Sequence, residues 1–145
     1  MERKIYDAED AVLKIKVEGT GGNVELKGKN AEVYMIPFAG TAEGPLFNGI
    51  VEPCGVDTQV VNAAGVRSMS ARYMLTGKDC EGKDAHIYIE NNGWFDEETK
   101  TMPFHTIPTF YTDSEALHEA LCRNEYTGEG RIEEDGLWIY FFEIQ

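Results

Sequence analysis

The chain has 145 residues, 42% of them hydrophobic, and a chain of this length usually forms one domain around one core, so we expect residues 1–145 to be a single domain. Thirteen basic and 26 acidic residues give a formal net charge of −13, which repels phosphate backbones and anionic lipids and excludes nucleic acid and membrane surfaces as expected partners. The sequence contains neither a membrane-spanning apolar run nor a signal-type stretch, and its cysteines form no CxxC pair, so we expect a cytoplasmic protein with reduced thiols.

Apolar and polar residues alternate with a period of two along much of the chain, which indicates β-strands. The alternation runs through residues 11–17, and the following segment 19–23 is Gly-Thr-Gly-Gly-Asn, which favours a tight reversal. We therefore predict a β-hairpin whose second strand is 24–26. Alternation or β-branched and aromatic content predicts further strands at 32–38, 46–51, 56–61, 69–75, 85–91 and 106–110.

The C-terminal third contains the one segment with helical spacing. Asp113 or Ser114 can cap a helix of two or three turns, whose apolar stripe includes Leu117 and Leu121. Two more strands are expected at 125–133 and 137–144, joined through Glu134-Asp135-Gly136, because Asp-Gly is a strong hairpin signal.

About nine or ten short strands with one late helix and no linker predict a mostly β protein. We expect a small antiparallel up-and-down β-barrel, because sequential hairpins need no long crossovers and closure removes exposed strand edges. Barrels of this strand number can hold one small ligand in the lumen.

Several short motifs follow one another in a specific order: GTAEGP (40–45), FNGIV (47–51), PCGVDTQ (53–59), ARYML (71–75), IYIENNG (87–93), PTF (108–110) and YTGEG (126–130). Together they resemble the signature of the family called domain of unknown function 3237, also known as uncharacterised protein family 0311. The resemblance covers about residues 31–144 and implies a small antiparallel β-barrel, but the family has no general assigned activity. Two residues depart from the pattern: Cys54 replaces a Gly and Thr58 replaces a Trp, so the aromatic wall that the Trp provides in relatives is missing and the ligand is expected to differ.

Parity along two neighbouring strands separates an apolar face from a polar one. Tyr73 shares a face with Leu75, and Asn91 shares a face with Ile89, so antiparallel pairing would direct a phenol and a carboxamide into an apolar lumen. A few polar groups in an apolar cavity are typical of a ligand site, and a buried Tyr can act as an acid or base. Tyr73 is thus a candidate catalytic residue and Asn91 a candidate ligand contact. The alternative is that the Tyr73 hydroxyl only completes a core hydrogen bond.

Arg72 and Tyr88 lie on the opposite face of the same strands. Arg72 either forms a cross-strand ion pair with Glu90 or binds a carboxylate or enolate oxygen of a substrate. We therefore keep Arg72 as a candidate catalytic residue and Tyr88 as a candidate ligand contact.

Asp57 and Gln59 share a face just after the turn at residues 53–55. An Asp in the lumen would be a plausible general base, because desolvation raises its pKa. The alternative is that Asp57 hydrogen-bonds nearby backbone amides. Asp57 is a candidate catalytic residue, and Gln59 a candidate ligand contact.

The sequence shows no motif for a metal or a nucleotide cofactor, and we expect none. His86, His105 and His118 lack metal-ligand spacing. The glycine-rich segments 19–22 and 128–130 lack the other residues of a phosphate-binding loop.

The predicted last strand is apolar on both faces, whereas a barrel strand needs only one apolar face. We expect the helix around Leu117 to cover part of the second face, and we expect a homodimer or higher homo-oligomer. One face carries Trp138, Tyr140 and Phe142, and the other carries Leu137, Ile139 and Phe141.

The leading functional hypothesis is that the lumen binds a small apolar or aromatic organic molecule and performs cofactor-independent acid–base chemistry, as in an isomerase, cyclase or lyase. Two alternatives stay open. The barrel could bind a ligand without catalysis, or it could be a structural oligomer whose lumen is simply packed.

Overall fold

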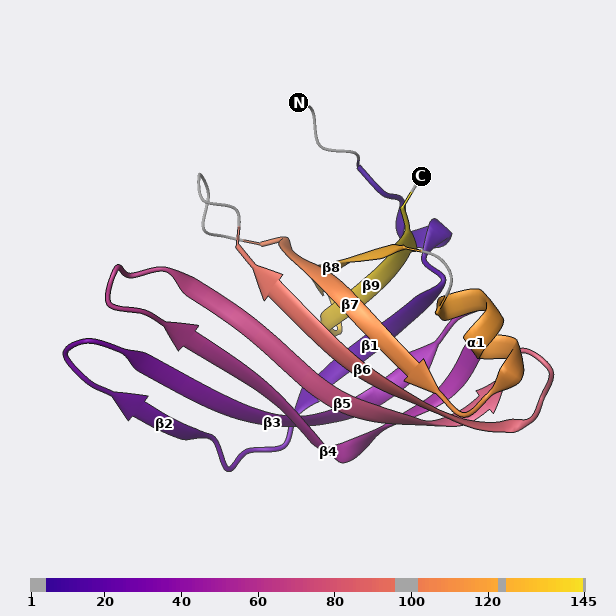
Figure 1. Ribbon diagram of the computed structural model, residues 1–145, viewed down its shortest axis with the longest axis horizontal. Helices are drawn as coiled ribbons and strands as arrows, with labels where there is room; N and C mark the ends of the chain where they lie inside the picture. The colour runs from indigo at the N-terminus through magenta and orange to yellow at the C-terminus, as the bar shows by residue number, and fades with distance from the viewer. Residues whose placement is uncertain (1–4, 96–101, 123–124, 145) are drawn as a thin grey trace.

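One antiparallel sheet contains every described strand and closes on itself in the computed structural model, which describes residues 5–95, 102–122 and 125–144 (Figure 1). A short 3-10 helix, η1 (Ala8–Asp10), precedes the sheet, and the helix α1 (Glu115–Leu121) lies between β7 and β8. The strands are β1 (Leu13–Gly19), β2 (Val24–Lys27), β3 (Glu32–Glu43), β4 (Phe47–Val61), β5 (Arg67–Asp79), β6 (Asp84–Trp94), β7 (Phe104–Thr112), β8 (Tyr126–Glu133) and β9 (Gly136–Glu143).

The barrel closes because β1 pairs with both β9 and β3. Its strand order is β1-β9-β8-β7-β6-β5-β4-β3, and β2 is an extra strand on β3. The predicted antiparallel barrel with one short helix is therefore confirmed. The predicted turn before Gly136 is also present, since Glu133 lies opposite Gly136 at the start of the β8–β9 hairpin.

The predicted hairpin between β1 and β2 is wrong. Both strands run antiparallel to β3 and pair with different halves of it, with Gly19 opposite Phe38 and Val24 opposite Met35. The segment between them stays beside β3, where the Thr20 N–H donates to the Pro37 carbonyl at 3.2 Å. β3 has 12 residues and is long enough to pair with both strands end to end. The glycine-rich segment 19–23 therefore connects two strands that follow one another along β3 and does not reverse the chain direction.

β4 is continuous where the sequence predicts two strands. Its pairing with β5 shifts between Val51 and Val56, which lie opposite Leu75 and Arg72. Four residues of β4 (52–55) thus lie opposite only two residues of β5 (73 and 74). The predicted break at residues 53–55 is an irregularity within one strand, because pairing on both sides of it holds β4 in the sheet.

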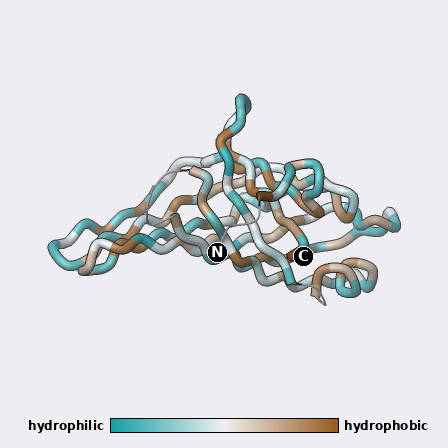
Figure 2. Tube along the Cα trace, turned by 90° about the horizontal axis from the view of Figure 1, so that it is seen from above, coloured by the Kyte–Doolittle hydropathy of each residue, from teal (hydrophilic) through white to brown (hydrophobic). Residues whose placement is uncertain are grey.

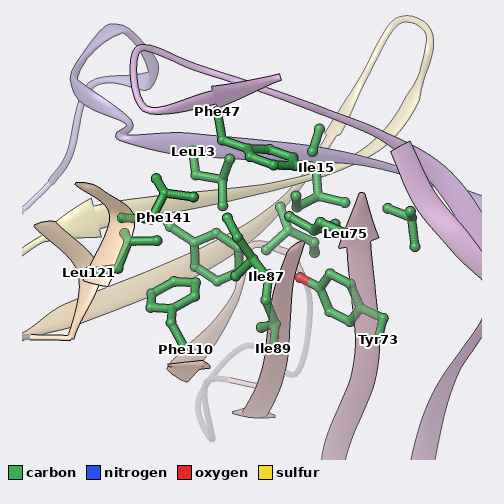
Figure 3. Close-up of a cluster of buried hydrophobic side chains, with 14 of the residues drawn as sticks. Leu13, Ile15, Phe47, Tyr73, Leu75, Ile87, Ile89, Phe110, Leu121 and Phe141 are labelled. Atoms are coloured by element: carbon green, nitrogen blue, oxygen red, sulfur yellow. The ribbon is translucent and has the colours of Figure 1, made fainter. Parts of the chain in front are cut away.

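One end of the barrel is filled by hydrocarbon and covered by α1. Leu13, Ile15 and Phe141 are fully buried there, and Figure 3 shows them around the same centre. The helix contributes Leu117 and Leu121 to this cluster. The rest of the cluster includes Phe47, Val51, Leu75, Ala85, Ile87, Ile89 and Phe110.

Because α1 buries Leu117 in the barrel core, the expectation that it covers the outer face of β9 is not met. The outer face of β9 is covered instead by Tyr6 and Arg131. The Tyr6 ring stacks on the Phe142 ring at 4.8 Å, and the Arg131 guanidinium lies 5.1 Å from the Tyr140 ring. The Arg131 Nη2 also donates to the Tyr6 carbonyl at 2.7 Å. The homo-oligomer stays a prediction, but an uncovered face of β9 no longer supports it, because Tyr6 and Arg131 cover that face.

A hydrogen-bonded connection attaches α1 to the turn between β5 and β6. The Ser114 hydroxyl caps the helix by accepting from the Leu117 N–H at 3.2 Å, and it donates to Asp79 Oδ2 at 2.7 Å. Asp79 Oδ1 accepts from the N–H groups of Glu81 and Lys83. The hydrogen bond from Ser114, followed by the one from the Lys83 backbone, holds the pKa of Asp79 below its ordinary value.

Cys54, Cys80 and Cys122 are exposed free thiols. In the described ranges, no helix combines the length and apolar character needed to cross a lipid bilayer.

Candidate ligand-binding pocket

The end of the barrel away from α1 contains a pocket. It encloses about 50 Å³ inside a larger hollow of about 450 Å³ that includes its open mouth. The enclosed part has room for a few water molecules, so a larger ligand must also occupy the mouth. The lining residues are Val17, Phe38, Asp57, Met69, Ala71, Tyr73, Asn91, Phe104, Thr106, Leu137 and Ile139.

Three buried polar atoms in this pocket have no hydrogen-bond partner among the described residues: the Tyr73 hydroxyl, Asn91 Oδ1 and Thr106 Oγ1. The three side chains belong to residues only 3–4% exposed. Buried polar groups in proteins nearly always have a partner, and leaving one without a partner costs about 1–3 kcal/mol. Three such atoms around one pocket are typical of a site that binds a polar part of a ligand.

Tyr73 is held on β5 between neighbouring strands. Its ring meets Phe38 edge to face at 5.1 Å, and a Cβ on Gly55 would lie 3.1 Å from the Tyr73 Cβ, so this glycine allows the close approach of β4. Burial, and secondarily the charge of Asp57, raises the pKa of Tyr73 far above its ordinary value. The phenol therefore stays protonated near neutral pH and serves as a hydrogen-bond donor, not as a base.

Asn91 and Thr106 come from the next two strands. Asn91 lies opposite Ala71 on β5, and Thr106 lies opposite Gly93 on β6 and Gly128 on β8. A Cβ on Gly128 would lie 2.1 Å from Thr106 Oγ1, so this glycine provides the space for the hydroxyl. Thr106 was not predicted as a site residue from the sequence, although its parity with Pro108 and Phe110 on β7 indicates that it faces the lumen.

Asp57 and Gln59 lie side by side on the inner face of β4. The Gln59 Nε2 donates to Asp57 Oδ2 at 2.9 Å, and the Gln59 Oε1 accepts from Arg67 Nη1 at 2.7 Å. Burial raises the pKa of Asp57, although the hydrogen bond from Gln59 and the charge of Arg67 oppose it. A carboxylate with a raised pKa beside an apolar pocket is suited to general-base chemistry. Arg67 is the second residue that the sequence analysis missed.

The raised pKa of Asp57 predicts a stabilising substitution. Between its unfolded-state and folded-state pKa values the folded chain binds more protons, so the free energy of unfolding falls as pH rises through that window. Asp57→Asn removes the charge and keeps an oxygen that accepts from Gln59. We expect it to raise the free energy of unfolding at pH 7 by about 0.5–2 kcal/mol, with the gain shrinking toward pH 4.

Urea denaturation at the two pH values measures this effect. The matched control is Asp84→Asn, because the Asp84 side chain is 86% exposed and its substitution should give no comparable gain. A less stable Asp57→Asn protein at pH 7 would contradict the assigned shift.

The structure does not bring Arg72 and Tyr88 to the pocket. Arg72 Nη1 lies 3.9 Å from Glu90 Oε1, and the Tyr88 hydroxyl donates to the same oxygen at 3.1 Å. Side chains alternate between the faces of a strand, so the neighbours of Tyr73 and Ile89 must point outward. The cross-strand ion pair with Glu90 is the arrangement observed, and neither Arg72 nor Tyr88 lines the pocket.

The three histidines lie outside the pocket lining. His86 Nδ1 is 2.7 Å from Asp113 Oδ2, and His105 Nδ1 is 3.8 Å from Glu129 Oε1. In the part of the chain that the structure describes, no three His, Cys, Asp or Glu side chains come together in a way that could hold a metal ion.

Comparison with known sequences identifies a family and a curated relative. The family described as "Protein of unknown function (DUF3237)" matches residues 10–144. A UPF0311 protein from Clostridium acetobutylicum is 37% identical over 100 aligned positions, which cover 55% of this chain. The chain matches only 58% of the length of that relative.

Comparison with solved structures gives similar folds over nearly the whole chain. A protein of unknown function from Clostridium acetobutylicum has a TM-score of 0.71 at 28% identity, with 93% of this chain and 97% of that chain covered. A β-barrel-like protein from Acinetobacter baumannii has a TM-score of 0.70 at 18% identity, with 94% of each chain covered. An enzyme from Penicillium herquei has a TM-score of 0.65 at 17% identity, with 92% of each chain covered. At such low identities the last two likenesses concern the fold alone.

Proposed function

The chain belongs to the DUF3237 family of proteins of unknown function, and from this premise we propose that its barrel binds a small, largely apolar or aromatic molecule and performs cofactor-independent acid–base chemistry on it. The observation that carries the proposal is the group of three unpartnered polar atoms, on Tyr73, Asn91 and Thr106, in the pocket that Asp57 also lines.

The polar atoms define what the ligand must offer. Asn91 Oδ1 accepts a hydrogen bond, so the ligand supplies an O–H or N–H group. The protonated Tyr73 phenol donates, so the ligand also supplies an acceptor such as a carbonyl oxygen. Thr106 can do either. With walls such as Phe38 and Leu137 around them, these groups suit an apolar frame that bears a hydroxyl beside a carbonyl.

The same groups can promote a proton transfer. Asp57 takes a proton from a carbon or oxygen acidified by the ligand carbonyl, and Tyr73 donates a hydrogen bond to the oxygen on which negative charge develops. Asp57 then returns the proton to another atom of the ligand, so the net reaction is an isomerisation without redox change. A general base in this position typically contributes about 10²–10⁴ in rate.

A ligand-binding barrel without catalysis is the second candidate. It is favoured by the raised pKa of Tyr73, which leaves Asp57 as the one group of the four that could exchange a proton near neutral pH. The hollow disfavours the third hypothesis, a structural protein with a packed lumen.

The first experiment is native mass spectrometry of the purified protein after incubation with a metabolite extract. We expect the wild-type protein to retain a small molecule that Tyr73→Phe retains about tenfold less well, since the change removes one buried hydrogen bond. Tyr88→Phe is the matched control, because Tyr88 lies on the outer face of the neighbouring strand and its loss should leave retention unchanged.

The retained compound then separates the two candidates. For an enzyme, Asp57→Asn abolishes conversion of the compound while its affinity is kept. For a binding protein, wild type and Asp57→Asn both return the compound unchanged. If no compound is retained, or if Tyr73→Phe and Tyr88→Phe behave alike, the pocket is not the ligand site.

A further inference from the structure

A second hollow lies beside the pocket, because residues that line the two are in contact. Its lining includes Glu32, Gln59, Val61, Arg67 and Phe95. The sheet projects to one side of the barrel (Figures 1 and 2).

The two hollows share a boundary. Gln59 in the second hollow donates to Asp57 in the first at 2.9 Å. Phe95 in the second hollow meets Phe104 in the first edge to face at 5.7 Å. A ligand whose hydroxyl- or carbonyl-bearing end meets Tyr73 and Asn91 in the enclosed pocket therefore extends over this boundary toward Arg67.

Arg67 is the only basic side chain that lines either hollow among the described residues. Its guanidinium lies 5.5 Å from the Tyr34 ring, and its Nη1 donates to the neutral amide of Gln59. The other two described arginines, Arg72 and Arg131, each have a glutamate as ion-pair partner. Within the described ranges, Arg67 has none.

An arginine without a carboxylate partner is unexpected in a chain with 26 acidic and 13 basic residues. A guanidinium has five N–H donors in a planar fork that matches a carboxylate, and Gln59 takes one of them. The ring of Tyr34 and the amide of Gln59 hold the fork in place, and no carboxylate of the described residues pairs directly with it, so its remaining donors are preorganised for an anion.

We propose that Arg67 binds a carboxylate at the end of the ligand that remains in the mouth, so that the ligand is an apolar or aromatic acid bearing a single negative charge. The inference rests on the proposed function, because it assigns the other end of the same ligand to the pocket of Tyr73 and Asn91. Glu32 lines the same hollow and Asp57 lies beside it, and their repulsion disfavours a doubly charged phosphate.

Titrations followed by NMR test the assignment with matched probes: 4-hydroxybenzoate and 6-hydroxy-2-naphthoate, their neutral amides, and phenyl phosphate. We expect the wild-type protein to bind each carboxylate about ten times more tightly than its amide. Arg67→Gln should remove this preference and leave amide binding within about twofold, since a charge-assisted pair is worth roughly a factor of ten or more.

Arg72→Gln is the control, because it removes the same charge from the same strand but from the outer face. It should leave the preference for the carboxylate intact. Arg67→Lys keeps the charge without the fork and should retain part of the preference. Circular dichroism and thermal unfolding establish that each variant is folded before it is titrated.

Several results would overturn the inference. They are equal binding of carboxylates and amides, equal loss in Arg67→Gln and Arg72→Gln, tighter binding of phenyl phosphate than of the carboxylates, and no carboxylate binding at about 10 mM. Failure of the proposed function gives a different result from failure of this inference. If the proposed function fails, the neutral amides bind independently of Tyr73, so that Tyr73→Phe binds them as well as the wild-type protein does.

Discussion

Replacing Gly40 by Ala should lower the free energy of unfolding by more than about 3 kcal/mol. Gly40 lies on β3 where the barrel closes, opposite Val17 of β1 and Val51 of β4. Its φ is +146°, and a Cβ there would lie 1.8 Å from the Lys16 carbonyl oxygen. Backbone atoms cannot move aside without separating β1 from β3, so the substitution strains the closure of the sheet.

Two other glycines separate the causes of this loss. Gly65→Ala introduces strain without a clash, since its φ is +80° and nothing lies within 4 Å, and we expect a loss of about 1–2 kcal/mol. Gly19→Ala meets neither problem and should change stability by less than about 1 kcal/mol. Chemical denaturation gives the free energy of unfolding of the three variants and therefore their order of stability. A Gly40→Ala protein as stable as Gly65→Ala would show that the contact between Gly40 and the Lys16 carbonyl is not rigid.

Phe141→Ala should cost about 3–5 kcal/mol, the usual range for a large aromatic side chain in a well-packed core. Phe141 is fully buried and meets Phe110 edge to face at 5.3 Å. It belongs to the cluster at the end of the barrel that α1 covers. Removing its ring leaves a cavity among side chains from several strands, which cannot all move to fill it.

The control for this substitution is Trp138→Ala, on the outer face of the same strand. The substitution removes the cation–π contact between Lys14 and the Trp138 ring and the hydrogen bond that Trp138 donates to Asp135. We expect it to lower the free energy of unfolding by about 1–2 kcal/mol. Urea unfolding compares the two variants. A Trp138→Ala protein destabilised as much as Phe141→Ala would mean that the outer face of β9 contributes as much to stability as the core.

Much of the fold and part of the site could be predicted from local sequence. Period-two alternation located most strands, and the Asp135-Gly136 pair located the β8–β9 turn. Parity also placed Tyr73 and Asn91 on the luminal face, where the pocket lies. The same rule places Arg72 and Tyr88 outside, so the sequence already contained the reason why the structure leaves them out of the pocket.

The sequence by itself determined which segments are strands and which side of each strand is apolar, because these properties depend on neighbours one or two positions away. Only the tertiary structure decided that β1 and β2 share β3, that Tyr6 covers Phe142, and that Gln59 connects Arg67 to Asp57. These contacts depend on which strands pair and in which register, and the pairing depends on strand lengths and on irregularities such as the one in β4. No local pattern specifies those quantities, so the pocket could be expected in kind but not in its full set of residues.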